Sequence, residues 1–227
     1  PIDDVIEEQW KVIVNEASKV GNFENSIVLS DVSGSMIGIP LEVSIALGII
    51  ISSLTAEPFK NQIITFHENP TFHHIPDTCE TLYDKVKNIE RMEWGGNTNF
   101  IGVFKLILDR AIKFKLTNDD LPKKLYVLSD MQFDIAFNNA SINFEYIKQL
   151  YTKNGYDMPQ IIFWNLRSDT TNDFPVKYDE NNTALISGFN LSILKQLLNT
   201  TDEINPYSIM RKTIDDKRYD KIKLYKD

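Results

Sequence analysis

The sequence has little of the chemistry that builds disulfide-rich or zinc-dependent proteins. Its 227 residues include one cysteine, Cys79, and only three histidines. One cysteine excludes an intrachain disulfide and every zinc cluster built on several cysteines. A reducing, intracellular environment is therefore the interpretation that we favour.

Long apolar runs and an excess of positive charge are also missing. The longest apolar stretch, Ile45–Leu54, is interrupted by Gly48 and by two serines, and it is too short to span a bilayer. Acidic residues outnumber basic ones 32 to 24, which gives a formal net charge of −8. This charge argues against broad binding of nucleic acid or of anionic membranes by this chain.

What the sequence does contain is typical of a globular protein, with 42% hydrophobic and 25% charged residues. At roughly 150 residues per domain, the length predicts one domain, or one domain with an appendage. We expect a lead-in helix over residues 1–22, a main domain over 23–200, and a C-terminal helical extension over 201–227 that packs on it. The chain begins with Pro1 rather than Met, so we expect it to be the C-terminal part of a longer protein.

Strands alternate with helices through most of the chain. Four strands are short and apolar on both faces, which is typical of a buried parallel sheet covered by helices on both sides: 26–30, 62–66, 124–128 and 160–164. Further strands are predicted at 71–75, 175–178 and 183–186, and helices at 2–19, 40–54, 81–92, 99–114, 142–151, 191–198 and around 207–214. The pattern predicts a three-layer α/β/α sandwich with a doubly wound, mainly parallel sheet. The turn at Asn69-Pro70 makes 71–75 the one antiparallel edge strand.

The loop after the first apolar strand carries a set of oxygen ligands. Asp31, Ser33 and Ser35 alternate along it, and Asp130 follows the strand over 124–128. Parallel strands end at one edge of the sheet, where ligands bind near the switch in strand order. A hydroxyl-rich set of oxygen atoms suits a hard cation such as Mg2+ and leaves it with several exchangeable waters.

The pattern Asp-x-Ser-x-Ser after a first strand resembles the metal-ion-dependent adhesion site of von Willebrand factor type A domains. That family also uses a threonine from a second loop and an aspartate after the fourth strand. The matching residues here, over a resemblance that covers about residues 20–200, are Asp31, Ser33, Ser35, Thr98 and Asp130. The resemblance implies that these five hold Mg2+, with Mn2+ or Ca2+ as alternatives.

The chain is also similar to a group of von Willebrand A-like proteins from plants, fungi and large DNA viruses. The similar segments are Asp31–Met36, Ile64–Pro70, Ser129–Asp134, Phe163–Arg167 and Ile186–Phe189. In that group a long helical region precedes the domain. A similar layout occurs in the Ro ribonucleoprotein family, where the helical repeats bind RNA and the A domain does not.

The function that this resemblance favours is that of an intracellular module that binds an Asp or Glu of a protein partner through Mg2+. One alternative is the A-domain half of an RNA-associated, Ro-like protein whose RNA contacts lie in a missing helical region. A second alternative is a weak metal-dependent phosphatase. The sequence leaves the identity of the partner and the oligomeric state open.

We do not expect an enzyme, because the residues that catalysis would need are not in place. The loop loosely resembles that of haloacid-dehalogenase-type phosphatases, but Ser33 stands where those enzymes have a second carboxylate. No Gly-x-x-x-x-Gly-Lys-Ser/Thr phosphate loop is present, and no histidine is placed as the base of a serine hydrolase.

Several side chains near the motif have a structural interpretation as well. Thr98 precedes a helix and can serve as its N-cap. Asp134 is better explained as a loop or capping residue than as a ligand. Asn165 can either line the site or satisfy backbone groups of its loop, and His67, His73 and His74 fit structural roles.

Overall fold

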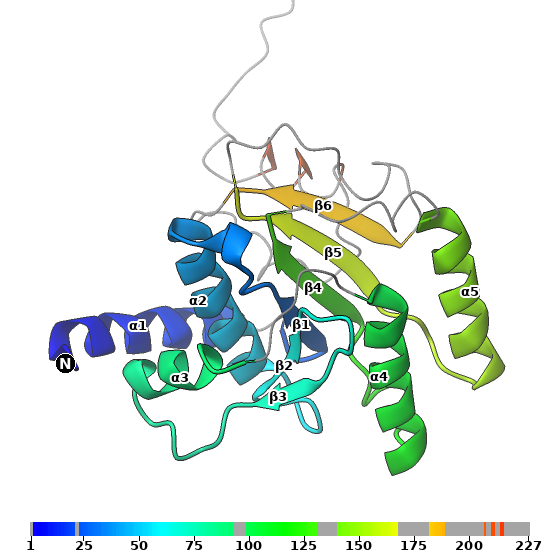
Figure 1. The fold of residues 1–227 in the computed structure, drawn as a ribbon, viewed down its shortest axis with the longest axis horizontal. Coiled ribbons are helices and arrows are strands. Elements are labelled where there is room, and N and C mark those ends of the chain that lie inside the picture. Colours follow the sequence, from blue (N-terminus) through cyan, green and yellow to red (C-terminus); the bar gives the residue numbers. More distant parts are fainter. Residues whose placement is uncertain are drawn as a thin grey trace, which may run out of the picture.

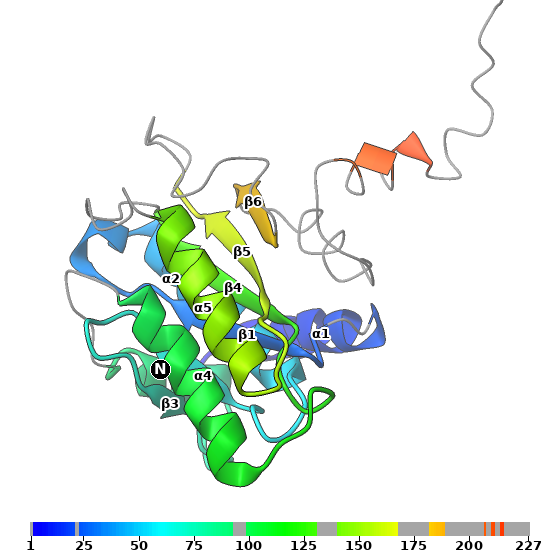
Figure 2. The same ribbon diagram turned by 90° about the vertical axis from the view of Figure 1, so that its right-hand side faces the viewer.

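The protein folds as a six-stranded sheet between two layers of helices (Figures 1 and 2). The computed structural model describes residues 2–20, 23–92, 99–130, 140–167 and 182–188, together with Tyr207, Met210, Arg211, Ile214 and Asp215. The helices are α1 (Asp4–Val20), η1 (Gly34–Met36), α2 (Ile39–Leu54), α3 (Leu82–Ile89), α4 (Phe100–Phe114) and α5 (Ala140–Lys153). The strands are β1 (Ser26–Ser30), β2 (Gln62–Thr65), β3 (Phe72–His74), β4 (Lys124–Ser129), β5 (Gln160–Asn165) and β6 (Thr183–Ser187).

The sheet is parallel except at one edge. Its strand order is β3-β2-β1-β4-β5-β6, and only β3 runs antiparallel to its neighbour among the described strands. The predicted mainly parallel, doubly wound sheet is therefore confirmed, and so is the antiparallel edge strand after the turn at residues 69–70. The chain crosses from one side of β1 to the other between β3 and β4, which makes the β1–β4 junction the switch point in strand order.

Each face of the sheet is covered by its own apolar core. On one face, Val28, Tyr126 and Ile162 pack with the buried side of α2 and with residues of α1 and α3. On the other face, Leu29 and Phe163 pack with α4 and α5, which lie together in front of the sheet in Figure 2. The central strands are buried on both faces, as the uninterrupted apolar segments of the sequence predict.

Local sequence signals explain where several helices begin. Pro40 stands in the first turn of α2, where its missing N–H leaves no hydrogen bond unmade. Thr81 and Asp84 form a reciprocal capping box at the start of α3. Asn99 caps α4 by accepting a hydrogen bond from the Gly102 N–H, so the capping position is occupied by Asn99 and not, as the sequence suggested, by Thr98.

Helix α2 packs directly against β1 and β2 at Gly48, where the lack of a side chain leaves room for the contact. A methyl group added there would meet Ser30 Oγ at 2.9 Å and Ile63 Cδ1 at 3.4 Å. Ser30 Oγ in turn lies 3.2 Å from both the carbonyl oxygen and the hydroxyl of Ser44. The end of β1, where the candidate site begins, is therefore positioned by direct contact with α2.

Some expectations fall outside the described residues: the strand over 175–178, the helix over 191–198, and the placement of Thr98 and Asp134. The division of the chain at residues 22 and 200 stays a prediction. Within the described part of the chain, no helix is long and apolar enough to cross a bilayer.

Candidate metal centre

Asp31 anchors the loop that leaves β1 at the carboxyl end of the sheet. Its side chain is buried, and its backbone N–H continues the β1–β4 ladder by donating to Leu128 O at 2.9 Å. The carboxylate oxygen Oδ1 accepts a hydrogen bond of 2.8 Å from the Ser33 N–H, which closes an Asx turn. The other oxygen, Oδ2, accepts one of 2.8 Å from the Ser129 hydroxyl. Asp31 thus holds the loop and the end of β4 together.

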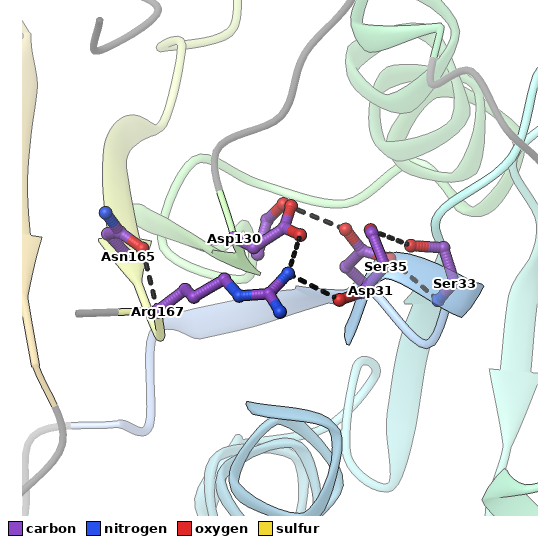
Figure 3. A network of polar contacts seen from close by, with 7 residues as sticks. Asp31, Ser33, Ser35, Asp130, Asn165 and Arg167 are labelled. Carbon is purple, nitrogen blue, oxygen red and sulfur yellow. Dashed lines mark hydrogen bonds and ion pairs between the residues drawn. The ribbon is translucent and has the colours of Figure 1, made fainter. Parts of the chain in front are cut away.

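The two serine hydroxyls of the loop face each other (Figure 3). Ser33 Oγ and Ser35 Oγ lie 3.1 Å apart. Neighbouring ligands of an octahedral Mg2+ ion, with metal–oxygen distances of about 2.1 Å, are about 3.0 Å apart. The spacing of the hydroxyls therefore matches that of two adjacent ligands of one ion.

Asp130 brings a second buried carboxylate to the same edge. It follows β4 directly, and its exposed fraction is 1%, against 2% for Asp31. Burial raises the pKa of Asp31 above its ordinary value and the Asp130 carboxylate adds to the rise, while the hydrogen bonds from Ser33 and Ser129 oppose it. Two neighbouring buried carboxylates repel one another when both are charged, and a cation between them removes that repulsion.

One side chain already supplies positive charge at this edge. Arg167 Nη1 lies 3.6 Å from Asp130 Oδ2 and donates a hydrogen bond of 2.9 Å to the carbonyl oxygen of Ser35. Asn165 orients this arginine, because its Oδ1 accepts a hydrogen bond of 2.9 Å from the Arg167 N–H (Figure 3). Of the two roles left open for Asn165, the structure shows the one that satisfies loop backbone.

The structure brings together four of the five residues that the motif singled out. Asp31, Ser33, Ser35 and Asp130 meet at the switch point between β1 and β4. Thr98 lies outside the described residues, so its place in the set stays a prediction.

Two residues of the site were not assigned to it from the sequence. The Ser129 hydroxyl binds Asp31 across 98 positions of sequence, and the Arg167 guanidinium binds the Ser35 carbonyl across 132 positions. Both stand at or just past the carboxyl end of a predicted strand, which is the signal that could have pointed to them.

The donor set fits a hard divalent cation. Asp31, Asp130 and the two serines offer only oxygen atoms, which suits Mg2+, Mn2+ or Ca2+. Within the described ranges, no three His, Cys, Asp or Glu side chains gather as a site built from those residue types alone would require.

The three histidines, as the sequence indicated, have structural partners. His67 Nδ1 accepts from the Asn69 N–H, and His73 Nε2 lies 2.7 Å from Asn88 Oδ1. His74 Nδ1 lies 3.0 Å from Gln62 Nε2.

The chain is similar to a viral protein in sequence and to a Ro protein in fold. Residues 25–225 match the model of a family described as a domain of unknown function (DUF7788). Uncharacterized protein L728 of Acanthamoeba polyphaga mimivirus is 37% identical over 209 residues, which make up 92% of this chain and 36% of that protein. The crystal structure of the Deinococcus radiodurans Ro (RSR) protein has a TM-score of 0.57 and 14% identity, and the match covers 88% of this chain and 39% of that one.

These similarities confirm two expectations from the sequence, the viral relative and the Ro-like fold. At 14% identity the likeness to the Ro protein shows the fold alone, which is von Willebrand A-like. The chain spans 36% of the viral relative and 39% of the Ro chain, so both proteins are much longer than the segment that matches.

Proposed function

The chain belongs to the family described as a domain of unknown function (DUF7788), and we propose that it is a metal-dependent protein-interaction module. Asp31, Ser33, Ser35 and Asp130, with Thr98 from the second loop, would hold Mg2+. The ion supplies, when bound, a positive centre with exchangeable waters that can take a carboxylate of a protein partner.

One observation carries this proposal: two buried carboxylates and a pair of hydroxyls converge where the strand order switches. Asp31 and Asp130 are each at most 2% exposed, yet they lie beside the loop that carries both serines. Burial of two like charges is unfavourable unless a cation or hydrogen bonds compensate for it. The side chains thus form an oxygen-rich site that favours added positive charge.

The same residues explain why the site would favour an acidic ligand. The two serines are neutral, so the protein supplies at most two negative charges to a divalent ion if Asp31 and Asp130 are the only charged ligands. An ion held mostly by hydroxyls and waters keeps more of its positive charge than one held by four carboxylates. A partner that presents Asp or Glu is therefore the ligand that this chemistry selects.

Metal binding is tested by titrating the chain with Mg2+ or Mn2+ in a calorimeter. We expect wild-type protein to bind one ion, and Asp31→Ala to lose binding by at least tenfold in affinity. Asp157→Ala serves as the matched control because Asp157 is an exposed acid in the loop before β5, at the opposite end of the strand from the site. Unchanged binding in Asp31→Ala would place the ion elsewhere on the protein.

Partner binding is tested by an affinity pull-down with wild-type and Asp31→Ala protein, each with Mg2+ and with a chelator, read by mass spectrometry. The proposal expects proteins that are captured by wild type only when Mg2+ is present. Partners that bind equally in chelator would show that the interaction surface lies away from the metal loop. Turnover of a generic phosphate ester that needs both Mg2+ and Asp31 would instead support the phosphatase alternative.

A further inference from the structure

We propose that Arg167 acts as a built-in competitor of the metal ion, neutralising Asp130 when no ion is bound. The inference rests on the proposed function because it concerns regulation of the same site. The charge of this one side chain would set the relative stability of the metal-free and the metal-bound protein.

The position of Arg167 supports a role at the metal loop rather than on the surface. Its guanidinium reaches from the end of β5 across the end of β4 to the loop after β1 (Figure 3). The Asx turn at Asn165 fixes the backbone of Arg167 from one side, and the Ser35 carbonyl fixes the guanidinium from the other. The arginine is therefore held at two points beside the proposed ligands.

The contact with Asp130 has the character of a charge interaction that a metal can replace. The 3.6 Å separation of Arg167 Nη1 from Asp130 Oδ2 is within ion-pair range but longer than a charge-assisted hydrogen bond of about 2.7–2.9 Å. The arginine side chain is 31% exposed whereas that of Asp130 is 1% exposed, so a guanidinium released from Ser35 O and Asp130 would reach solvent while the carboxylate would stay buried.

Two consequences follow when the charge of Arg167 is removed. In the metal-free protein, Asp130 loses its nearby cation, and a buried carboxylate that loses a compensating charge destabilises the fold. In the metal-bound protein, the divalent ion is no longer repelled by the positive charge of the Arg167 guanidinium. Both effects widen the difference between the two states, so an uncharged side chain at position 167 should tighten metal binding.

The experiment compares Mn2+ affinity, by electron paramagnetic resonance of free against bound ion, in wild type, Arg167→Gln and Arg167→Lys. We expect Arg167→Gln to bind Mn2+ about tenfold more tightly than wild type, which corresponds to about 1.4 kcal/mol. Arg167→Lys keeps the charge and should stay within about threefold of wild type. The charge-matched control is Lys123→Gln, since Lys123 is an exposed residue just before β4, at the other end of that strand from Asp130.

A second measurement uses thermal unfolding of the same proteins in chelator and in saturating Mn2+. The rise in Tm on adding Mn2+ should be larger for Arg167→Gln than for wild type and Lys123→Gln, because its metal-free form is less stable. If wild type binds Mn2+ and Arg167→Gln binds it equally or more weakly, the competition is absent although the metal site stands. If only Arg167→Gln binds Mn2+, the competition is supported. If Mn2+ binds to none of these proteins, the metal site itself and the competition both fail.

Discussion

At the scale of single residues, the position of Asp31 and the ligand role proposed for it make opposite demands on its charge. As the metal ligand that we propose it would have to be ionised, but its burial raises its pKa and so disfavours the ionised form in the metal-free fold. The hydrogen bonds from Ser33 and Ser129 favour the charged form and compensate in part. A buried acid of this kind makes the loop more stable with a cation than without one.

This conflict predicts a pH-dependent effect of Asp31→Asn on stability in chelator. A folded-state pKa above the unfolded value means that the native protein binds more protons in the window between the two. The free energy of unfolding of wild type therefore falls as pH rises from the unfolded pKa, about 3.9, to the raised folded pKa. The amide introduced by the substitution does not titrate, so the variant avoids this loss. The Ser129 hydroxyl can reverse its role to accept from the new amide.

We expect Asp31→Asn to be more stable than wild type at pH 7 in chelator, with the difference shrinking as pH falls toward 4. Saturating metal should reverse the order, because an ion at about 100 times its Kd stabilises wild type by about 2.7 kcal/mol. Urea unfolding across pH, with and without Mg2+, measures both effects. A variant less stable than wild type at pH 7 in chelator would show that the hydrogen bonds to the carboxylate outweigh its burial.

At the scale of elements, the site depends on how closely helix α2 approaches strand β1. Gly48 is the residue that permits this approach, and Ser30, which precedes Asp31, is the residue approached. A shift of α2 would thus move the beginning of the loop after β1, which carries Asp31, Ser33 and Ser35.

Gly48→Ala should destabilise the protein by about 1 kcal/mol. Alanine gains about 1 kcal/mol over glycine in a helix interior, but overpacking against Ser30 and Ile63 costs about 1–3 kcal/mol. The methyl group should also weaken metal binding by displacing the end of β1. Chemical unfolding and calorimetry measure the two effects.

Two further variants test the cause of the Gly48 effect. Adding Ser30→Ala to Gly48→Ala removes the clashing Oγ, so the double variant should lose less stability than the two single changes add up to. Gly34→Ala is a control for the stability measurement alone, because an added methyl there meets nothing within 4 Å although the residue lies between the proposed ligands Ser33 and Ser35. Strict additivity in the double variant would show that the contact with Ser30 is not what the alanine disturbs.

At the scale of the whole molecule, the net charge bears on whether this chain itself contacts RNA, since the RNA-associated alternative places those contacts in a missing helical region. The chain carries a net charge of −8 and spans about 36% of its viral relative. Phosphate contacts by Lys and Arg supply most non-specific RNA affinity, and an acidic domain is poorly suited to make them.

We expect this chain to bind RNA with a Kd above about 10 µM in filter binding at physiological salt. A basic RNA-binding domain of similar size, run in parallel, serves as the positive control. Tight binding that weakens steeply with added salt would overturn the interaction-only function and place RNA contacts on this domain.

The sequence by itself determined the kinds of elements and the chemistry at their ends. Strands β1, β4 and β5 are apolar on both faces, and this local pattern is enough to predict a buried parallel sheet. Because parallel strands end at one edge, the sequence was enough to predict that Asp31 and Asp130 lie at the same edge of the sheet.

The tertiary structure alone decided which side chains meet at that edge. Contact between Asp31 and Ser129, or between Ser35 and Arg167, depends on β1 lying beside β4 and β4 beside β5 in a particular register. These contacts join residues 98 and 132 positions apart. Local periodicity reports which face of a strand is buried but not which strand lies next to it, because neighbours are chosen by packing across the whole sheet.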